Sequence, residues 1–184
     1  MGRLQYAVLC SLDGYTVDAE GRFDWAMPDE EVHRFVNDLE RPVGTHLYGR
    51  RMYETLAVWQ DMGGPDESPI ENDYADIWRA ADKVVYSTTL AEVSTPRTRL
   101  ERSFDPDAVR GSVADADRDV SIGGPGLAAH ALRAGLVDDV HHFLHPVVVG
   151  GGTRALPVDV RLDLELVDEH RFGNGVVHLH HRRR

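Results

Sequence analysis

A glycine-rich stretch after an apolar segment has the residue types of a phosphate-binding turn. Residues 120–122 have the pattern of a buried strand end, and residues 127–132 place apolar side chains on one face of a helix. Glycines between the two permit backbone angles closed to other residues and leave the main chain uncovered. The free N–H groups and the positive end of the helix dipole then suit a phosphate anion. The turn comprises Gly123, Gly124, Pro125, Gly126 and Leu127.

An ordinary strand-to-helix turn would explain the same residues. Glycines are common in such turns, and the spacing is not the GxGxxG dinucleotide fingerprint. Residues 123–136 contain no Asp or Glu, so the protein's own charge does not fill the site. The motif alone leaves both interpretations open.

Length and charge restrict the class of protein. With 184 residues and 42% hydrophobic content, the chain can bury one core, and we expect a single domain over residues 1–184. The net charge of −11 argues against a protein that binds nucleic acid or an anionic membrane, because such binding relies on clustered Lys and Arg. The single cysteine, Cys10, cannot form an internal disulfide, and the first apolar run is too short for a signal peptide or membrane span. We therefore expect a cytoplasmic protein.

Strand-like and helix-like segments alternate along the chain. A helix is expected after Pro28, where apolar residues from Val32 to Leu39 recur at i, i+3, i+4 and i+7. Residues 61–73 have the composition of a surface loop, and residues 77–81 of one helical turn. The strands are expected at residues 4–12, 45–48, 83–86, 120–122, 140–149, 162–167 and 176–180, with further helices at 50–59, 105–113 and after the glycine-rich turn. This order implies a three-layer α/β fold with a mostly parallel central sheet, antiparallel C-terminal strands and helices on both faces.

Six histidines fall on two of the expected strands and raise the question of a metal site. No HExxH motif or cysteine-containing ligand set accompanies them, and neighbours in sequence alternate between the two faces of a strand. We expect no metal, and we expect these histidines on strand surfaces. They are His141, His142, His145, His178, His180 and His181.

Six short segments resemble one enzyme superfamily in their order and spacing. They are residues 11–14 (SLDG), 48–54 (YGRRMYE), 85–90 (VYSTTL), 122–127 (IGGPGL), 135–139 (GLVDD) and 145–152 (HPVVVGGG). Together they resemble the dihydrofolate reductase superfamily, specifically the branch similar to the reductase domain of the bifunctional riboflavin-biosynthesis enzyme. The resemblance covers nearly the whole chain and implies the dihydrofolate-reductase-like form of the α/β fold.

The resemblance implies NADPH as the cofactor, bound across the carboxyl edge of the sheet. The turn at Gly49 and Arg50 matches the one whose arginine reaches the cofactor phosphates, and a guanidinium can bond two phosphate oxygens. The Gly123–Gly124 pair matches one that implies a cis peptide bond. The implied cofactor-binding residues are those of the glycine-rich turn together with Gly49, Arg50, Arg51, Ser87, Thr88 and Thr89. Alternatively, the arginines are solvated charges at a helix start and the hydroxyls only end a strand.

The resemblance also implies hydride transfer to a C=N bond of a pterin-like or ribosylaminopyrimidine substrate, which needs a proton for the nitrogen. Glu31 matches the acidic residue early in the first helix of folate-reducing relatives, with Asp29 and Glu30 as rivals. Asp13, in the segment that closes over the nicotinamide, is the second candidate. Alternatively, Glu31 stabilises a helix dipole and Asp13 bonds its own turn. Trp25 precedes that helix and is expected beside the substrate.

Several functional alternatives stay open at this point. The expected absence of a zinc-binding deaminase domain counts against the riboflavin intermediate, and the match to the other branch counts against dihydrofolate. A reductase of a different heterocycle, or a nucleotide-binding protein without turnover, remains. Relatives in this branch imply a homodimer, for which residues 147–149 and 176–179 are candidate contacts.

Overall fold

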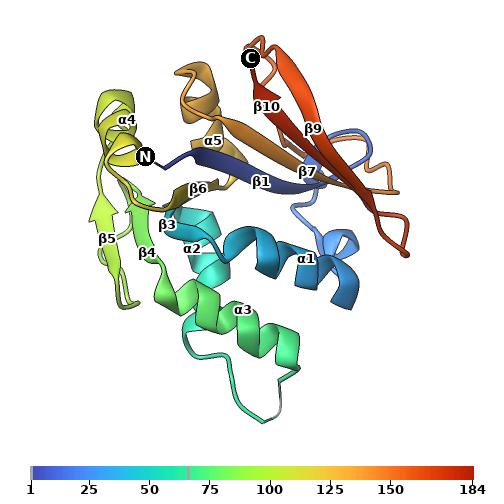
Figure 1. The fold of residues 1–184 in the computed structure, drawn as a ribbon, viewed down its shortest axis with the longest axis horizontal. Helices are drawn as coiled ribbons and strands as arrows, with labels where there is room; N and C mark the ends of the chain where they lie inside the picture. Colours follow the sequence, from blue (N-terminus) through green and yellow to red (C-terminus); the bar gives the residue numbers. More distant parts are fainter. Residues whose placement is uncertain (1, 66) are drawn as a thin grey trace.

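The structure is a computed structural model that describes residues 2–65 and 67–184 (Figure 1). Its centre is an eight-stranded sheet in the order β5-β4-β3-β6-β1-β7-β10-β9. Neighbours from β5 to β7 pair in parallel, whereas β10 is antiparallel to both β7 and β9. The strands are β1 (Leu4–Ser11), β3 (Val43–Gly49), β4 (Asp82–Tyr86), β5 (Thr98–Glu101), β6 (Asp119–Gly123), β7 (Asp139–His145), β9 (Leu164–Arg171) and β10 (Val177–Arg183). The mostly parallel sheet with an antiparallel C-terminal part is confirmed.

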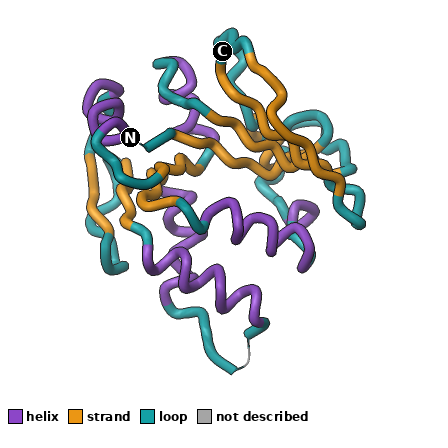
Figure 2. Tube along the Cα trace, viewed as in Figure 1, coloured by secondary structure: helices purple, strands orange, loops and turns teal. Residues whose placement is uncertain are grey.

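Helices cover both faces of this sheet, as the sequence predicts. Figures 1 and 2 show α4 and α5 on one side and α1 and α3 on the other. The α-helices are α1 (Glu30–Glu40), α2 (Arg50–Leu56), α3 (Pro69–Ala80), α4 (Pro106–Ala114) and α5 (Pro125–Arg133). Two short 3₁₀ helices, η1 (Asp24–Ala26) and η2 (Ala57–Gln60), and a separate ribbon of β2 (Tyr15–Val17) and β8 (Thr153–Arg154) complete the elements. Among the described residues, no helix combines the length and apolar character needed to cross a membrane.

Two apolar layers hold the helices onto the sheet. On one side, Leu132 of α5 and Val109 of α4 share a buried cluster with Tyr6 of β1. On the other side, Val32 of α1 packs with Phe143 of β7. Burying one such side chain contributes roughly 1.5–3 kcal/mol relative to leaving it exposed. These layers fix the carboxyl edge of the sheet, where the loops that carry the candidate site begin.

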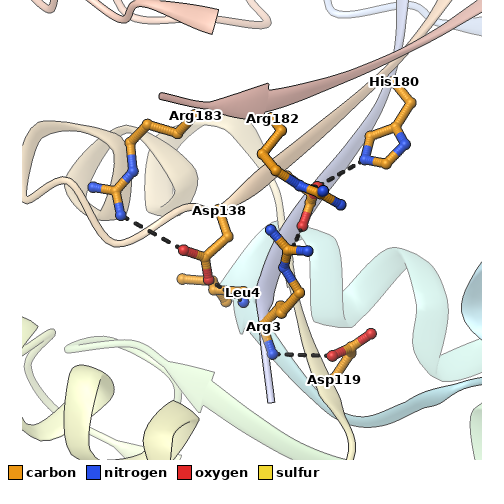
Figure 3. Close-up of polar contacts among 8 residues, drawn as sticks. Arg3, Leu4, Asp119, Asp138, His180, Arg182 and Arg183 are labelled. Carbon is orange, nitrogen blue, oxygen red and sulfur yellow. Dashed lines mark hydrogen bonds and ion pairs between the residues drawn. The ribbon is translucent and has the colours of Figure 1, made fainter. Parts of the chain in front are cut away.

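Carboxylates at the amino ends of β6 and β7 fix the start of β1 (Figure 3). The backbone N–H of Arg3 donates to Oδ1 of Asp119 at 3.0 Å. The next N–H, of Leu4, donates to Oδ2 of Asp138 at 3.0 Å. These contacts satisfy donors that the strand ladder does not reach, and they set β1 between its two parallel neighbours.

Asp139, the first residue of β7, is buried and collects three nitrogen groups. Its Oδ2 lies 2.9 Å from Nε of Arg3, and its Oδ1 accepts a hydrogen bond from Nε of Arg182 at 3.1 Å. Nε2 of His180 lies 2.8 Å from the same Oδ1. Burial alone would raise the pKa of Asp139, but the hydrogen bond with His180 and the charges of Arg3 and Arg182 hold that pKa below its usual value. The ionised carboxylate therefore joins β1, β7 and β10.

Asp139→Asn should lower the free energy of unfolding at neutral pH by about 1–3 kcal/mol, because donors at a buried site lose their charged acceptor. Arg3 and Arg182 are each 42% exposed, so solvent screens part of the effect. Since the native pKa lies below the unfolded value of about 3.9, the stabilisation is present above that value and is lost as pH falls through the native pKa. Urea denaturation should show a difference between variant and wild type that shrinks in acid. A difference independent of pH contradicts this assignment.

The structure corrects the region between β3 and β4. Residues 61–73 were expected as a loop and 77–81 as one helical turn, but α3 begins at Pro69 and runs for 12 residues. The side chain of Ser68 accepts from the N–H of Glu71, the carboxylate of Glu71 accepts from the N–H of Ser68, and Pro69 occupies the first turn. This is a capping box, whose Ser-x-x-Glu spacing was legible in the sequence. The strand β5 was also not expected, and β7 ends at His145 instead of continuing to residue 149.

The histidines on β7 and β10 also differ from expectation, because several are buried and not on the surface. His141 and His178 are 5% and 2% exposed, and Nδ1 of His141 lies 3.1 Å from Nε2 of His178. Burial lowers their pKa values to about 3 and about 4, so both rings are neutral at neutral pH. The ring of His178 packs against Phe35 and Phe143, with centroids 4.7 Å apart in each pair, which explains why these polar residues are tolerated inside. Within the described ranges, no group of three or more His, Cys, Asp or Glu residues has the arrangement to hold a metal ion.

Candidate functional site

A cavity of about 670 Å³ opens beyond the carboxyl ends of β3, β4 and β6. Ligands of open parallel sheets bind at this kind of edge, and the volume is in the range of small-molecule sites. Three segments distant in sequence meet there: the turn after β3, the turn after β4 and the glycine-rich turn after β6. The sequence-predicted residues that line the cavity are Gly49, Arg50, Arg51, Thr89, Gly124, Pro125, Gly126 and Leu127.

Two helices begin at the cavity wall without a capping side chain. Gly49 precedes α2 and Gly124 precedes α5, and neither first turn contains an acidic residue. By contrast, side chains cap the other three α-helices of the described chain: Asp29 for α1, Ser68 for α3 and Asp105 for α4. The first-turn N–H groups of a helix have no intrahelical acceptor. Those of α2 and α5 are therefore left for an acceptor from outside the helix, beside the partial positive charge of two dipoles.

The glycine-rich turn has a different backbone from the one implied by the resemblance. No peptide bond in the described residues is cis, so the expected cis bond between Gly123 and Gly124 is wrong. The chain is redirected instead by Gly124, whose φ of +91° is a conformation that L side chains rarely adopt. Gly123 is required by close approach, because a Cβ there would lie 2.9 Å from the ring of Tyr48. A Cβ on Gly124 would lie 3.3 Å from Cβ of Met52.

Arg50 connects the start of α2 to the turn after β4. Its Nε donates to Oε1 of Glu54 at 2.7 Å, and its Nη1 donates to Oγ1 of Thr89 at 3.0 Å. Oγ of Ser87 accepts from the N–H groups of Thr89 and Leu90 at 3.2 and 2.9 Å, which closes the turn. Thus Thr89 faces the cavity, whereas Ser87 shapes the turn. Neither Ser87 nor Thr88 is among the residues that line the cavity.

Sequence reasoning missed the ribbon that forms another wall of the cavity. Thr16 and Val17 of β2 and Thr153 of β8 line it. The loop before β8 passes so close to β2 that a Cβ on Gly152 would collide with the carbonyl oxygen of Val17. The run of three glycines at residues 150–152 was the only hint of this close approach that the sequence offers. A two-residue strand such as β8 is too short to show the alternation of apolar and polar residues that identifies a strand.

Asp13 fixes the loop that leads into this ribbon. Its carboxylate accepts from the N–H groups of Val149 at 3.2 Å and Gly150 at 2.8 Å. Hydrogen bonding with the Ser11 hydroxyl is the largest effect and lowers the pKa of Asp13. Burial opposes it, and the hydrogen bonds from the two amides add to the lowering. An acid with a lowered pKa stays ionised at neutral pH and is a weaker proton donor. The contacts of Asp13 therefore favour the structural alternative, and its catalytic role stays a prediction.

Glu31 also has a structural partner. Its Oε2 accepts from the N–H of Gly173 at 2.9 Å, in the turn between β9 and β10. It does not line the large cavity. Of its rivals, Asp29 caps α1 by accepting from the N–H of Val32 at 3.0 Å. A role for Glu31 in proton delivery stays a prediction.

Trp25 lies in η1, beside the carboxyl end of β7. Its ring meets the ring of His145 edge-on, with the centroids 6.1 Å apart. Nε1 of Trp25 and Nε2 of His145 are both buried without a hydrogen-bond partner among the described residues. Burial lowers the pKa of His145, partly offset by the nearby charge of Asp29. Because β7 is parallel to β1 and β6, these groups lie at the same edge of the sheet as the cavity.

Comparison with known proteins agrees with this architecture. The family model of the RibD C-terminal domain matches residues 3–178. The uncharacterized protein YyaP of Bacillus subtilis (strain 168) is 27% identical over 173 residues, which cover 92% of this chain and 88% of that protein.

Solved structures show the same fold at low sequence identity. A pyrimidine reductase-like protein from Corynebacterium diphtheriae has a TM-score of 0.70 at 14% identity, covering 100% of this chain and 92% of that one. Dihydrofolate reductase from Enterococcus faecalis, complexed with NADP(H), has a TM-score of 0.60 at 12% identity, covering 100% and 97%. The chain therefore has the dihydrofolate-reductase-like fold and belongs to the RibD C-terminal domain family, a family of reductases.

Proposed function

We propose that this chain is an NADPH-dependent reductase that transfers a hydride to a C=N bond of a ribosylaminopyrimidine or pterin-like heterocycle. The observation that carries the proposal is the pair of uncapped helix N-termini that open, beside Arg50, onto one cavity. A pyrophosphate needs several N–H donors and a cation within a short span, and this wall offers both.

The residues present fit such a cofactor. A Cβ built on Gly126 would meet no heavy atom within 4 Å, so the backbone there is open to the cavity. The N–H groups at the start of α5 would hold the pyrophosphate, and Arg50 with Thr89 would hold the additional phosphate of the adenosine ribose. When bound, the nicotinamide supplies the hydride. The ribbon of β2 and β8 would shield the site from water through Val17.

The substrate would lie at the same edge, next to Trp25. Nε1 of Trp25 and Nε2 of His145 are buried without a hydrogen-bond partner in the described part of the chain, and they would pair with the polar edge of a heterocycle. The proton for the substrate nitrogen would come from an acidic residue near the start of α1 or from an ordered water. The family and the pyrimidine reductase-like relative support a pyrimidine substrate, and the likeness to dihydrofolate reductase supports a pterin as the second candidate.

The test follows NADPH absorbance with each substrate class in turn. We expect oxidation of NADPH in the presence of a ribosylaminopyrimidine, and slower or no oxidation with dihydrofolate. Calorimetry on the same preparation measures NADPH binding without substrate. Tight binding without turnover of either heterocycle would point to a different substrate or a binding protein, and no binding would overturn the proposal.

We further propose that the protein is a homodimer. Val148 on the loop after β7 is 67% exposed, and Leu166 and Val167 of β9 are 50% and 44% exposed. Exposed apolar side chains on the edge strand β9 and on the loop after β7 are two candidate elements for a subunit contact. Of the contacts named from the sequence, Val176 is 1% exposed and belongs to the core, so it is not available to a partner.

Light scattering at micromolar concentration should give about twice the chain mass of 20.6 kDa. Val148→Glu should shift the population toward the monomer, because it places a charge on the proposed contact. A single species at the monomer mass for the wild type contradicts the dimer.

A further inference from the structure

The turn after β4 has an unusual amount of support for a segment without regular secondary structure. Ser87 closes it from inside, with Oγ accepting from the N–H groups of Thr89 and Leu90. Arg50 reaches it from the cavity side through Oγ1 of Thr89. The hydroxyl of Tyr53 accepts from the N–H groups farther along the same connection, at Ser94 and Thr95.

A fourth support comes from Arg102, the residue after β5. Its Nη1 donates to the carbonyl oxygens of Ser87 at 3.2 Å and Leu90 at 2.5 Å, and its Nη2 donates to the carbonyl oxygen of Ala91 at 3.2 Å. The planar guanidinium presents five donors in a fixed fork, so one side chain can hold three carbonyl groups in one arrangement. A lysine has a single nitrogen and cannot span the same set.

Holding these carbonyls also orients the amides on the opposite side of the turn. In a trans peptide unit, the C=O of one residue and the N–H of the next point in opposite directions. Fixing the carbonyl of Ser87 toward Arg102 therefore turns the N–H of Thr88 away from Arg102. That N–H has no acceptor among the hydrogen bonds of the described chain, so it is available to an external oxygen.

Arg102 forms no ion pair with a carboxylate of the described residues. Its partners are all carbonyl oxygens, and no salt bridge to it occurs within residues 2–65 and 67–184. Arg99, within β5, differs, because its Nε lies 3.3 Å from Oε1 of Glu101. The turn is thus backed by one uncompensated positive charge and faced by Arg50, which favours a ligand with a dianionic phosphate.

We infer that Arg102 is a positioning residue that holds residues 87–91 in the shape that receives the 2′-phosphate of the cofactor, and that it thereby sets the preference for NADPH over NADH. This inference rests on the proposed function. Arg102 touches the turn and not the phosphate, so its effect passes through Thr88 and Thr89.

The experiment compares Arg102→Gln, Arg102→Lys and the control Arg99→Gln. Calorimetry gives the dissociation constants for NADPH and NADH, and hydrogen exchange of the unliganded protein gives the protection of the N–H groups of Thr89 and Leu90. We expect Arg102→Gln to weaken NADPH binding at least tenfold and NADH binding less than threefold, with faster exchange at both amides. Arg99→Gln should change neither, because an exposed ion pair contributes little.

Arg102→Lys separates positioning from charge. A positioning role predicts that the lysine restores neither the exchange protection nor the affinity, because it cannot hold three carbonyls. Full recovery of both by lysine would show that charge alone matters and would overturn the inference. It is also overturned if Arg102→Gln keeps the wild-type ratio of the two constants. If the wild type binds neither nucleotide, the proposed function itself has failed.

Discussion

Gly126→Ala should weaken NADPH binding at least tenfold, about 1.4 kcal/mol, while leaving the protein as stable as the wild type or slightly more stable. The two effects have opposite signs for separate reasons. A Cβ at Gly126 meets no heavy atom within 4 Å, and alanine is favoured over glycine in a helix by up to about 1 kcal/mol. The same methyl group would stand on the cavity wall, between a phosphate and the first N–H groups of α5.

The matched control is Gly111→Ala in α4. That glycine is also helical and exposed, and a Cβ on it would meet nothing within 4 Å, but it lies outside the cavity. It should therefore show the gain in melting temperature without the loss of affinity. If Gly126→Ala binds NADPH as tightly as the wild type does, the N–H groups at the start of α5 do not bind the cofactor phosphates.

Gly124→Ala should lose both stability and affinity. Its φ of +91° with ψ of 124° is a sparsely populated conformation that costs alanine roughly 1–3 kcal/mol, and the new Cβ would lie 3.3 Å from Cβ of Met52. Melting temperature and NADPH affinity measured on the same sample show whether the losses occur together. A variant of wild-type stability would contradict the backbone geometry described for this turn.

The parts of the site that could be predicted from sequence are those with a local signature. The turn after β6 combines an apolar strand end, three glycines and Pro125. Each of these residue types has a known preference for a local backbone conformation. The detailed conformation of the turn could not be predicted, because the close approach of Tyr48 to Gly123 and of Met52 to Gly124 comes from other elements of the fold.

Contacts set by topology could not be predicted in the same way. Arg102 reaches the turn after β4 only because β5 pairs in parallel with β4, and β5 is a four-residue strand without a readable pattern. The partner of Glu31 is 142 residues away, at Gly173. The helix α3 was missed for a different reason: its capping box was present in the sequence, but the composition of the preceding loop outweighed it.

Arg50→Ala should weaken NADPH binding by about 1–3 kcal/mol and NADH binding by less, because a charged hydrogen bond to the extra phosphate is lost. Nε of Arg50 is held by Glu54 and Nη1 by Thr89, which fixes the guanidinium at the cavity edge before a ligand arrives. Because the Arg50 side chain is already ordered, its immobilisation on binding costs little free energy, and most of the energy of its bond to the phosphate contributes to affinity.

A matched control for this substitution is Arg34→Ala on α1. Arg34 pairs with Glu30 at 3.0 Å, and Arg50 pairs with Glu54 at 2.7 Å, both with i,i+4 spacing on exposed helix surface. Each variant loses a helical ion pair of about 0.3–0.5 kcal/mol. Arg50→Ala also loses the hydrogen bond to Thr89, so its melting temperature should fall somewhat further than that of Arg34→Ala. Only Arg50→Ala should change nucleotide affinity, because Arg34 does not line this cavity.

The wild-type ratio of affinities decides what Arg50 does. If Arg50 and Thr89 meet the 2′-phosphate, NADPH should bind at least tenfold tighter than NADH, about 1.4 kcal/mol, and the ratio should collapse toward one in Arg50→Ala. Because the extra interaction is between a guanidinium and a dianion at an exposed edge, added salt should reduce the NADPH affinity more than the NADH affinity. Equal wild-type affinities, or a ratio unchanged by the substitution, would mean that Arg50 serves only the pyrophosphate or only Glu54.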